Sequence, residues 1–407
     1  MLTQEIDKYI SQMSKEQQDK LNRYLLDRCD NSNRKRKFNV VFDLLHQCDI
    51  ACRGCGTNAC KVEEQLIVDN FLKYEDVILI LNKIKTFIEE NKLDVFINFG
   101  GGEPFLRDDI IDILKKAAEL FGASSIGIDT NASLDSSYEK LCTAMNYVGY
   151  VGVSINGLHD YHNWWANNSK IDAFLKATET VKKLCEIPQH AEKIEVTTVV
   201  TKRNMDSIPE LMKYLKTLNV RNYSLHRPIP VGRMKHYFET LIPSSIEYFK
   251  LLNDVVEHSA ILDMNAHMHH SIEGIFGSLV AGIDTYYDDN FANTNYRSSI
   301  GIEPNGDVVV DPWCTVGFWN QLKFGNILEN DVEIKDLFDA KDSLLNRLRE
   351  TISKAKRCNG CKQNCSGGSR VVAAASKLYG MNDDIDLNAI LKAMEAVDPA
   401  CPFADKE

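Results

Sequence analysis

A strand-then-helix pattern repeats six times through the middle of the chain, and this alternation limits the fold more than any other feature of the sequence. The expected strands span residues 38–45, 94–99, 125–129, 147–155, 193–200 and 220–226. The amphipathic stretches between them include residues 74–90, 108–121, 171–184 and 205–218. Alternation of this kind predicts an α/β fold with a parallel sheet and crossover helices. Six units are too few for a complete eight-stranded barrel.

Three cysteines follow the first expected strand in a CX3CX2C arrangement: Cys48, Cys52 and Cys55. Cysteine thiolates hold cubane iron–sulfur clusters, generally four per cluster, so three ligands on one tight loop leave one iron open. The alternative is a closed tetrahedral zinc site, to which Cys60 or His46 would supply the fourth ligand. The loop therefore predicts a metal centre.

A second motif, Phe-Gly-Gly-Gly-Glu-Pro at residues 99–104, follows the second expected strand. Its glycines let a ligand approach the backbone closely, and the carboxylate of Glu103 can accept hydrogen bonds from an ammonium group. Active sites of parallel barrels lie at the C-terminal ends of the strands. We therefore expect this motif and the cysteine loop to form one site.

The two motifs together resemble the signature of radical S-adenosylmethionine (SAM) enzymes. The resemblance implies a partial (β/α)6 TIM-like barrel with a SAM-binding [4Fe–4S] cluster on the three cysteines of the loop. Gly101, Gly102 and Glu103 would lie at the methionine end of SAM. In this family an electron from the cluster cleaves SAM to methionine and a 5'-deoxyadenosyl radical, which abstracts hydrogen from the substrate. A reducing electron donor such as flavodoxin or ferredoxin is implied as a partner.

Further strand ends carry polar residues where the family contacts SAM. Thr130 and Asn131 follow the third expected strand. The fourth ends in Ser154-Ile-Asn156-Gly, then His-Asp, which resembles the family's S-x-D-G…H-D stretch with Asn156 in place of Asp. Ser154 is then the better candidate for contact with the SAM ribose or carboxylate. Such residues also end strands simply as turn formers. Gly54 stands where the family often has an aromatic residue near adenine.

The C-terminal region holds a second group of cysteines after a predicted hairpin, residues 300–310, with Asn-Gly at its turn. It resembles the SPASM domain, an auxiliary-cluster module of radical SAM enzymes, although a cysteine ahead of the hairpin is missing and Ser369 replaces another. The resemblance implies one auxiliary [4Fe–4S] cluster on four ligands: Cys358, Cys361, Cys365 and Cys401. A zinc knuckle on the same cysteines is an alternative. A competing set of cluster ligands has Cys314 in place of Cys401, and this set resembles the smaller twitch version of the domain.

Cys314 is left over by the first ligand set. The resemblance to SPASM domains implies a position near the barrel mouth, where a thiol could donate hydrogen to a substrate radical. A buried apolar role is the alternative. The expected domains are a helical extension (1–36), the barrel (37–235), a helical bridge (236–290) and the SPASM-like domain (291–407). In the bridge, His267 and His270 would share a helix face, and we favour packing or substrate contact for them over metal binding.

Composition narrows the classes of partner. The net charge of −11 over 407 residues argues against nucleic acid, whose phosphates require clustered Lys and Arg. We expect a cytoplasmic protein with no membrane partner, because no apolar run has spanning length and no signal peptide is recognisable. In that reducing compartment, twelve cysteines favour metal ligation over disulfides.

The resemblance implies a peptide- or protein-modifying radical enzyme as the first hypothesis. SPASM-type relatives often act on ribosomally made peptides. A small-molecule enzyme acting on a sugar or aminocyclitol is the second hypothesis. An iron–sulfur carrier or sensor is the third, although such a protein has little use for the Gly-Gly-Glu-Pro motif.

Overall fold

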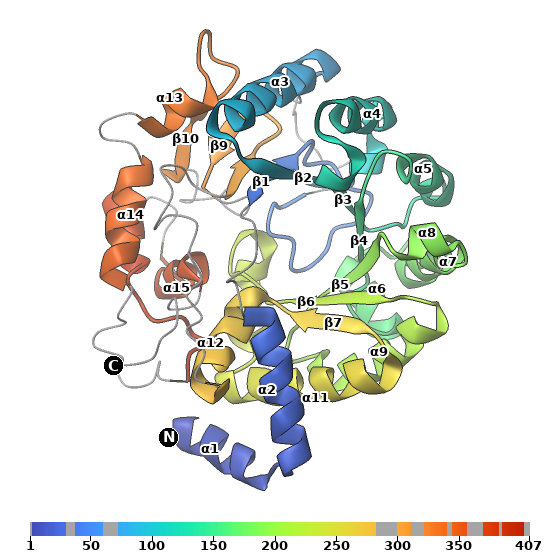
Figure 1. Ribbon diagram of the computed structural model, residues 1–407, viewed down its shortest axis with the longest axis vertical. Coiled ribbons are helices and arrows are strands. Elements are labelled where there is room, and N and C mark those ends of the chain that lie inside the picture. The colour runs from blue at the N-terminus through green and yellow to red at the C-terminus, as the bar shows by residue number, and fades with distance from the viewer. Residues whose placement is uncertain are drawn as a thin grey trace.

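The computed structural model describes residues 2–29, 37–59, 72–281, 299–310, 321–339, 344–355, 369–381 and 385–402. Within these residues, ten strands form one sheet in the order β10-β9-β8-β1-β2-β3-β4-β5-β6-β7. The strands are β1 (Lys37–Asp43), β2 (Asp94–Gly100), β3 (Ile126–Thr130), β4 (Tyr150–Ser154), β5 (Ile194–Val199), β6 (Asn222–His226), β7 (Asn265–Met268), β8 (Ser299–Ile302), β9 (Asp307–Val309) and β10 (Lys323–Asn326). Figure 1 shows β1 to β7 curving around the middle of the molecule.

The parallel part of the sheet is wider than the six predicted strands. Strands β1 to β6 occupy the predicted segments and pair in parallel with their neighbours in the chain. β7 adds a parallel strand beside β6, and β8 adds one beside β1. β9 and β10 continue the sheet in antiparallel pairing. The α/β fold with an open parallel core is confirmed, and two later segments extend it.

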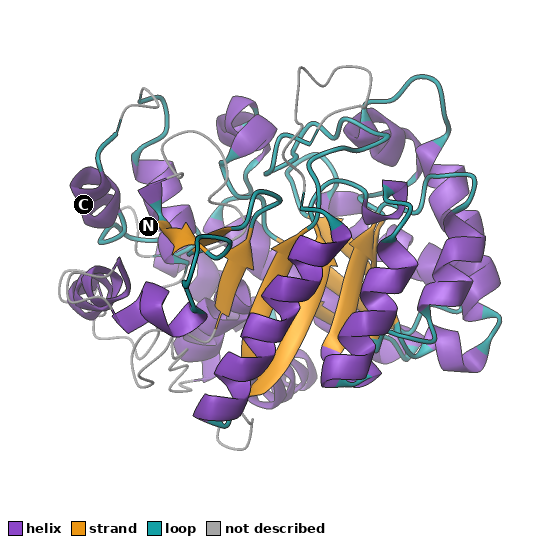
Figure 2. Ribbon diagram, turned by 90° about the horizontal axis from the view of Figure 1, so that it is seen from above, coloured by secondary structure: helices purple, strands orange, loops and turns teal. Residues whose placement is uncertain are grey.

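Amphipathic helices connect the strands and cover the outside of the curved sheet (Figure 1). They are α3 (Tyr74–Asn91), α4 (Ile110–Phe121), α5 (Ser137–Ala144), α7 (Ala173–Cys185) and α9 (Ile208–Thr217). In α3, the buried Val77, Ile80, Ile84 and Ile88 recur every three or four residues and form one apolar stripe. Figure 2 shows most of the long loops at the end of the sheet toward which the parallel strands point.

The segment after the barrel is not helical throughout. It consists of α11 (Ser245–Leu262), then β7, then α12 (His270–Ala281). His267 lies in β7 opposite Ser224 of β6, and only His270 begins a helix, so the expectation that the two histidines share a helix face is wrong. The physical reason is that β7 satisfies the backbone groups that the edge of β6 would otherwise leave unpaired.

The N-terminal helices pack on this segment. Helices α1 (Leu2–Gln12) and α2 (Lys15–Cys29) contact α11 and α12. The Tyr24 hydroxyl donates to Oε1 of Glu273 at 2.6 Å, and the same oxygen accepts from the Met268 N–H at 2.9 Å. Glu273 therefore connects α2 and β7 to α12. This arrangement fits the packing role that we favour for the His267 segment better than it fits metal binding.

The predicted hairpin at residues 300–310 is confirmed as the β8–β9 pair. Gly306 has a φ of +85° in the connecting turn, a conformation that glycine adopts without strain. Within the described parts of the chain, no helix combines the length and apolarity needed to cross a bilayer.

Candidate active site

The cysteine loop and the glycine-rich turn meet at the C-terminal ends of β1 and β2. The N–H of Gly102 donates to the Leu45 carbonyl at 2.7 Å, and the N–H of Glu103 donates to the Gln47 carbonyl at 2.8 Å. Gly101 has a φ of +108°, and a Cβ on Gly102 would lie 1.8 Å from the Gln47 oxygen. These glycines therefore permit close approach of the loop that leads to Cys48.

Glu103 is fully buried, and three donors fix its carboxylate. Thr130 donates its hydroxyl at 2.8 Å, and the backbone N–H groups of Asn131 and Phe105 donate at 2.9 and 3.2 Å. Burial and, to a smaller extent, the charge of the Asp49 carboxylate raise the pKa of Glu103 to about 7. A cationic group placed beside this oriented carboxylate would favour its ionised form.

Asn131 connects this carboxylate to the cysteine loop. Its side-chain N–H₂ lies 3.6 Å from Sγ of Cys48 and donates to Oδ1 of Asp49 at 2.8 Å. Ser133 donates its hydroxyl to the other oxygen of Asp49 at 2.5 Å. Asp49 and Ser133 were absent from the sequence prediction; the only sequence signal was a polar residue directly after the first cysteine.

The three thiols of the loop are free and interact electrostatically. Burial and, to a smaller extent, the charge of Cys52 raise the pKa of Cys48 well above its ordinary value. Burial and, to a smaller extent, the charge of Cys55 raise the pKa of Cys52 to about 12. Three thiolates crowded in a buried site are costly unless a cationic centre neutralises them. The thiols therefore fit a cluster held by three protein ligands.

The two candidates for a fourth zinc ligand do not complete such a site within the described residues. His46 has its Nε2 3.4 Å from the carboxylate of Glu303, a residue in the β8–β9 turn. Cys60 lies outside the described residues, as do Cys314, Cys358, Cys361 and Cys365.

The segment after β6 braces the cysteine loop from another side. Arg233 donates through Nε to the Cys52 carbonyl and through Nη2 to the Ala59 carbonyl, both at 2.7 Å. Its positive charge also acts to lower the pKa of the Cys52 thiol. The preceding Gly232 has a φ of +54°, and a Cβ there would lie 2.4 Å from the Cys55 oxygen. The sequence analysis named no site residue in this segment.

Helix α6 (His159–Ala166) supports the loop where Gly54 lacks a side chain. The N–H of Arg53 donates to the Trp165 carbonyl at 2.9 Å. The Trp165 indole is buried, and a Cβ on Gly54 would lie 2.1 Å from its Cη2. Trp165 therefore occupies the space beside position 54 that an aromatic residue in the loop would require.

The other predicted strand-end residues lie at the same edge of the sheet. Ser154 is the last residue of β4 and is half-buried. Asn156 is buried; its side-chain oxygen accepts from the Val199 N–H at 2.9 Å, and its carbonyl accepts from the Asn204 side chain at 2.8 Å. Asn156 thus ties the ends of β4 and β5 together.

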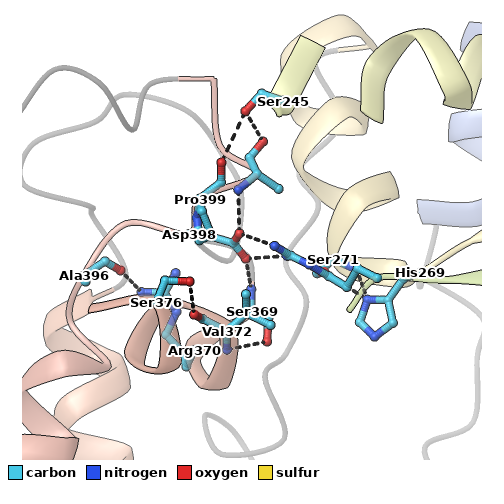
Figure 3. A network of polar contacts seen from close by, with 12 residues as sticks. Ser245, His269, Ser271, Ser369, Arg370, Val372, Ser376, Ala396, Asp398 and Pro399 are labelled. Atoms are coloured by element: carbon cyan, nitrogen blue, oxygen red, sulfur yellow. Dashed lines mark hydrogen bonds and ion pairs between the residues drawn. The ribbon is translucent and has the colours of Figure 1, made fainter. Parts of the chain in front are cut away.

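A buried ion pair attaches the C-terminal segment to the barrel. Arg227, directly after β6, makes two 2.8 Å hydrogen bonds to the carboxylate of Asp398. Asp398 also accepts from the N–H of Ser369, which caps α15 (Arg370–Lys377), at 2.6 Å (Figure 3). The segment that carries the half-buried Cys401 is therefore fixed beside the strand end.

A parallel partial barrel with three clustered thiols and a buried carboxylate at its strand ends defines a class of iron–sulfur enzyme. Residues 44–225 match the Radical SAM superfamily. These residues therefore form a radical SAM domain, and the superfamily that they match uses a [4Fe–4S] cluster and SAM. The match favours an enzyme over the carrier or sensor hypothesis.

Relatives resemble this chain well beyond the matched domain. Pre-heme d1 synthase of Dinoroseobacter shibae is 22% identical over 353 residues, which cover 82% of each chain. Mycofactocin maturase MftC of Mycolicibacterium smegmatis is 24% identical over 340 residues, 81% of this chain and 77% of that one. The structure of Streptococcus suis SuiB bound to precursor peptide SuiA has a TM-score of 0.61 at 19% identity, covering 91% of this chain and 79% of that one. The shared fold thus includes most of the chain.

The contact between Gly54 and Trp165 predicts that Gly54→Ala destabilises the protein. The added Cβ must displace the indole, and overpacking of this kind costs about 1–3 kcal/mol. The free energy of unfolding in urea, measured anaerobically, checks the change. In the double variant Gly54→Ala with Trp165→Phe, the smaller ring should restore part of the loss. Equal stability of wild type and Gly54→Ala would contradict the packing.

The buried Arg227–Asp398 pair predicts a larger loss of unfolding free energy than the loss expected for Gly54→Ala. Arg227→Met leaves a buried carboxylate without its cation, which typically costs about 3–5 kcal/mol of unfolding free energy. The matched control is Lys392→Met, which removes the exposed Lys392–Glu395 pair and should cost less than about 1 kcal/mol. Urea unfolding measures both variants. Similar small losses would show that the buried pair does not anchor the C-terminal segment.

Proposed function

We propose that this enzyme modifies a ribosomally synthesised peptide or protein by abstracting hydrogen from one of its residues. The observation that carries the proposal is the network in which Asn131 joins the carboxylate of Glu103 to Cys48 and Asp49. It brings a group suited to the ammonium of SAM beside a thiol suited to an iron ligand. The similarity to mycofactocin maturase and to the structure of SuiB bound to a precursor peptide supports the substrate class.

Each residue of the site has a role in this proposal. Cys48, Cys52 and Cys55 would hold the cluster, which when bound supplies an electron for cleavage of SAM to methionine and the 5'-deoxyadenosyl radical. Gly101, Gly102, Glu103, Thr130 and Asn131 would form the pocket for the methionine end, with Ser154 and Asn156 along the rest of SAM. Full burial of Glu103 excludes water from its carboxylate and strengthens its bond to an ammonium group.

An open groove beside the cysteine loop supports a peptide substrate. Its volume is about 520 Å³, and Arg53, Trp164 and residues 167–172 are part of its lining. Arg53 is itself a residue of the cysteine loop. The side chains of Asn163 and Asn168 in this lining are held by hydrogen bonds within the protein, so this wall of the groove is polar and fixed.

We also propose one auxiliary [4Fe–4S] cluster on Cys358, Cys361, Cys365 and Cys401. Its roles would be electron transfer and shaping of the substrate cavity, because four thiolates leave no iron open. The Arg227–Asp398 pair supports this by holding the Cys401 segment next to the barrel.

A small-molecule substrate is the second candidate. Pre-heme d1 synthase, whose name describes action on a small molecule, aligns over 82% of both chains. A sugar or aminocyclitol belongs to the same class of substrate. The electron donor in either case would be a flavodoxin or ferredoxin.

The function is tested with reduced, reconstituted protein, SAM and a short precursor peptide encoded beside the gene. We expect 5'-deoxyadenosine and a mass change in the peptide, both followed by mass spectrometry. The matched control changes Cys48, Cys52 and Cys55 to Ala; it should lose about four irons, keep roughly half of the total and form no 5'-deoxyadenosine. Cleavage of SAM by this control would overturn the site assignment. An unchanged peptide beside abundant 5'-deoxyadenosine would favour the small-molecule class.

Cys314 is the proposed hydrogen donor of an epimerisation: its thiol would give a hydrogen atom to the substrate radical, and one electron from the flavodoxin or ferredoxin with one proton would return the resulting thiyl radical to the thiol. Cys314→Ala should keep the iron content of wild type and change the product, because the substrate radical then lacks its thiol donor. Iron analysis and product mass distinguish the alternatives. Lost iron would identify Cys314 as a cluster ligand, and unchanged iron with unchanged product would dismiss the donor role.

A further inference from the structure

Three potential metal ligands come together at the edge of the barrel, apart from the cysteines. They are Asp43 at the end of β1, His46 in the loop that follows and Glu303 in the β8–β9 turn. One ligand atom from each lies within 4.8 Å of the others. The parallel pairing of Phe42 with Ile302 explains the arrangement, because it places the residues that follow at neighbouring strand ends.

The two carboxylates are deeply buried. Asp43 is 3% exposed and Glu303 is 6% exposed. Oε1 of Glu303 has no hydrogen-bond partner, and its Oε2 lies 3.4 Å from Nε2 of His46, beyond a good hydrogen-bond length. A buried carboxylate oxygen without a partner costs free energy unless a cation or donor satisfies it.

Among the described residues, the nearby lysine and arginine side chains form ion pairs with carboxylates other than Glu303. Lys323 of β10 is bound to Asp307 at 2.9 Å. Arg107 donates two hydrogen bonds to the carboxylate of Asp109. It also donates to the carbonyls of Leu44 and Leu72. The Glu303 carboxylate therefore faces His46 and Asp43, and Lys323 acts on it through its charge without forming an ion pair with it.

We propose that Asp43, His46 and Glu303 bind a divalent transition-metal cation, separate from the cysteine-held cluster. One imidazole nitrogen and two carboxylates suit Mn²⁺, Fe²⁺ or Zn²⁺, and the two carboxylate charges balance the cation. Three protein ligands leave coordination positions for water or a substrate oxygen. The cation also ties the β8–β9 hairpin to the loop that carries Cys48.

The test uses the reconstituted holoenzyme after anaerobic treatment with EDTA, without SAM or substrate. Mn²⁺ is added, and the EPR signal of free Mn²⁺ measures binding. We expect about one Mn²⁺ per chain for wild type and about tenfold or more weaker binding for Glu303→Gln, because one charged ligand is lost. Glu329→Gln changes an exposed carboxylate after β10 and should bind Mn²⁺ like wild type.

Iron content and urea unfolding separate loss of the site from loss of the fold. Glu303→Gln should keep the iron of wild type, and Mn²⁺ should raise the unfolding midpoint of wild type but not of this variant. Asp43→Asn serves as a second variant with the same expected result. No binding of Mn²⁺ or Zn²⁺ by wild type at roughly 1 mM, or equal binding by Glu303→Gln, would overturn the proposal. This outcome is independent of SAM cleavage and of the substrate class.

Discussion

The active site depends on close backbone contact between the turn after β2 and the loop after β1. Gly101 and Gly102 allow the carbonyls of Leu45 and Gln47 to approach, and two hydrogen bonds hold the two segments together. This contact sets the position of Glu103 relative to Cys48. A side chain at Gly102 would separate the segments, so the glycines are needed by the fold itself before any ligand binds.

Ionisable groups are concentrated around this contact. Cys48 and Glu103 have raised pKa values because they are buried and because each lies near Asp49. Such a site is poorly stable with all of its groups ionised, and it gains stability from cationic partners. Bound iron and the ammonium group of SAM would both meet this requirement. Asp43 and Glu303 place two further carboxylates at the ends of neighbouring strands.

Segments far from the cysteines in sequence hold their loop in place. Arg233 binds the loop carbonyls, and the Trp165 indole packs where Gly54 leaves room. On the other side of the strand ends, Arg227 and Asp398 attach the segment of Cys401. The cysteine loop has little regular structure of its own, so its geometry comes from these contacts.

Local patterns in the sequence determined the six barrel strands, their helices, the β8–β9 hairpin and the meeting of the two motifs. Periodicity reports which face of a segment is buried, and parallel strands bring their ends to one edge. Only the tertiary structure decided that the segment of His267 pairs with β6 as a strand, that Trp165 and Arg233 reach the cysteine loop, and that Glu303 lies beside His46. Each of these outcomes depends on contact between residues far apart in the chain, and no local spacing of residues encodes such a contact.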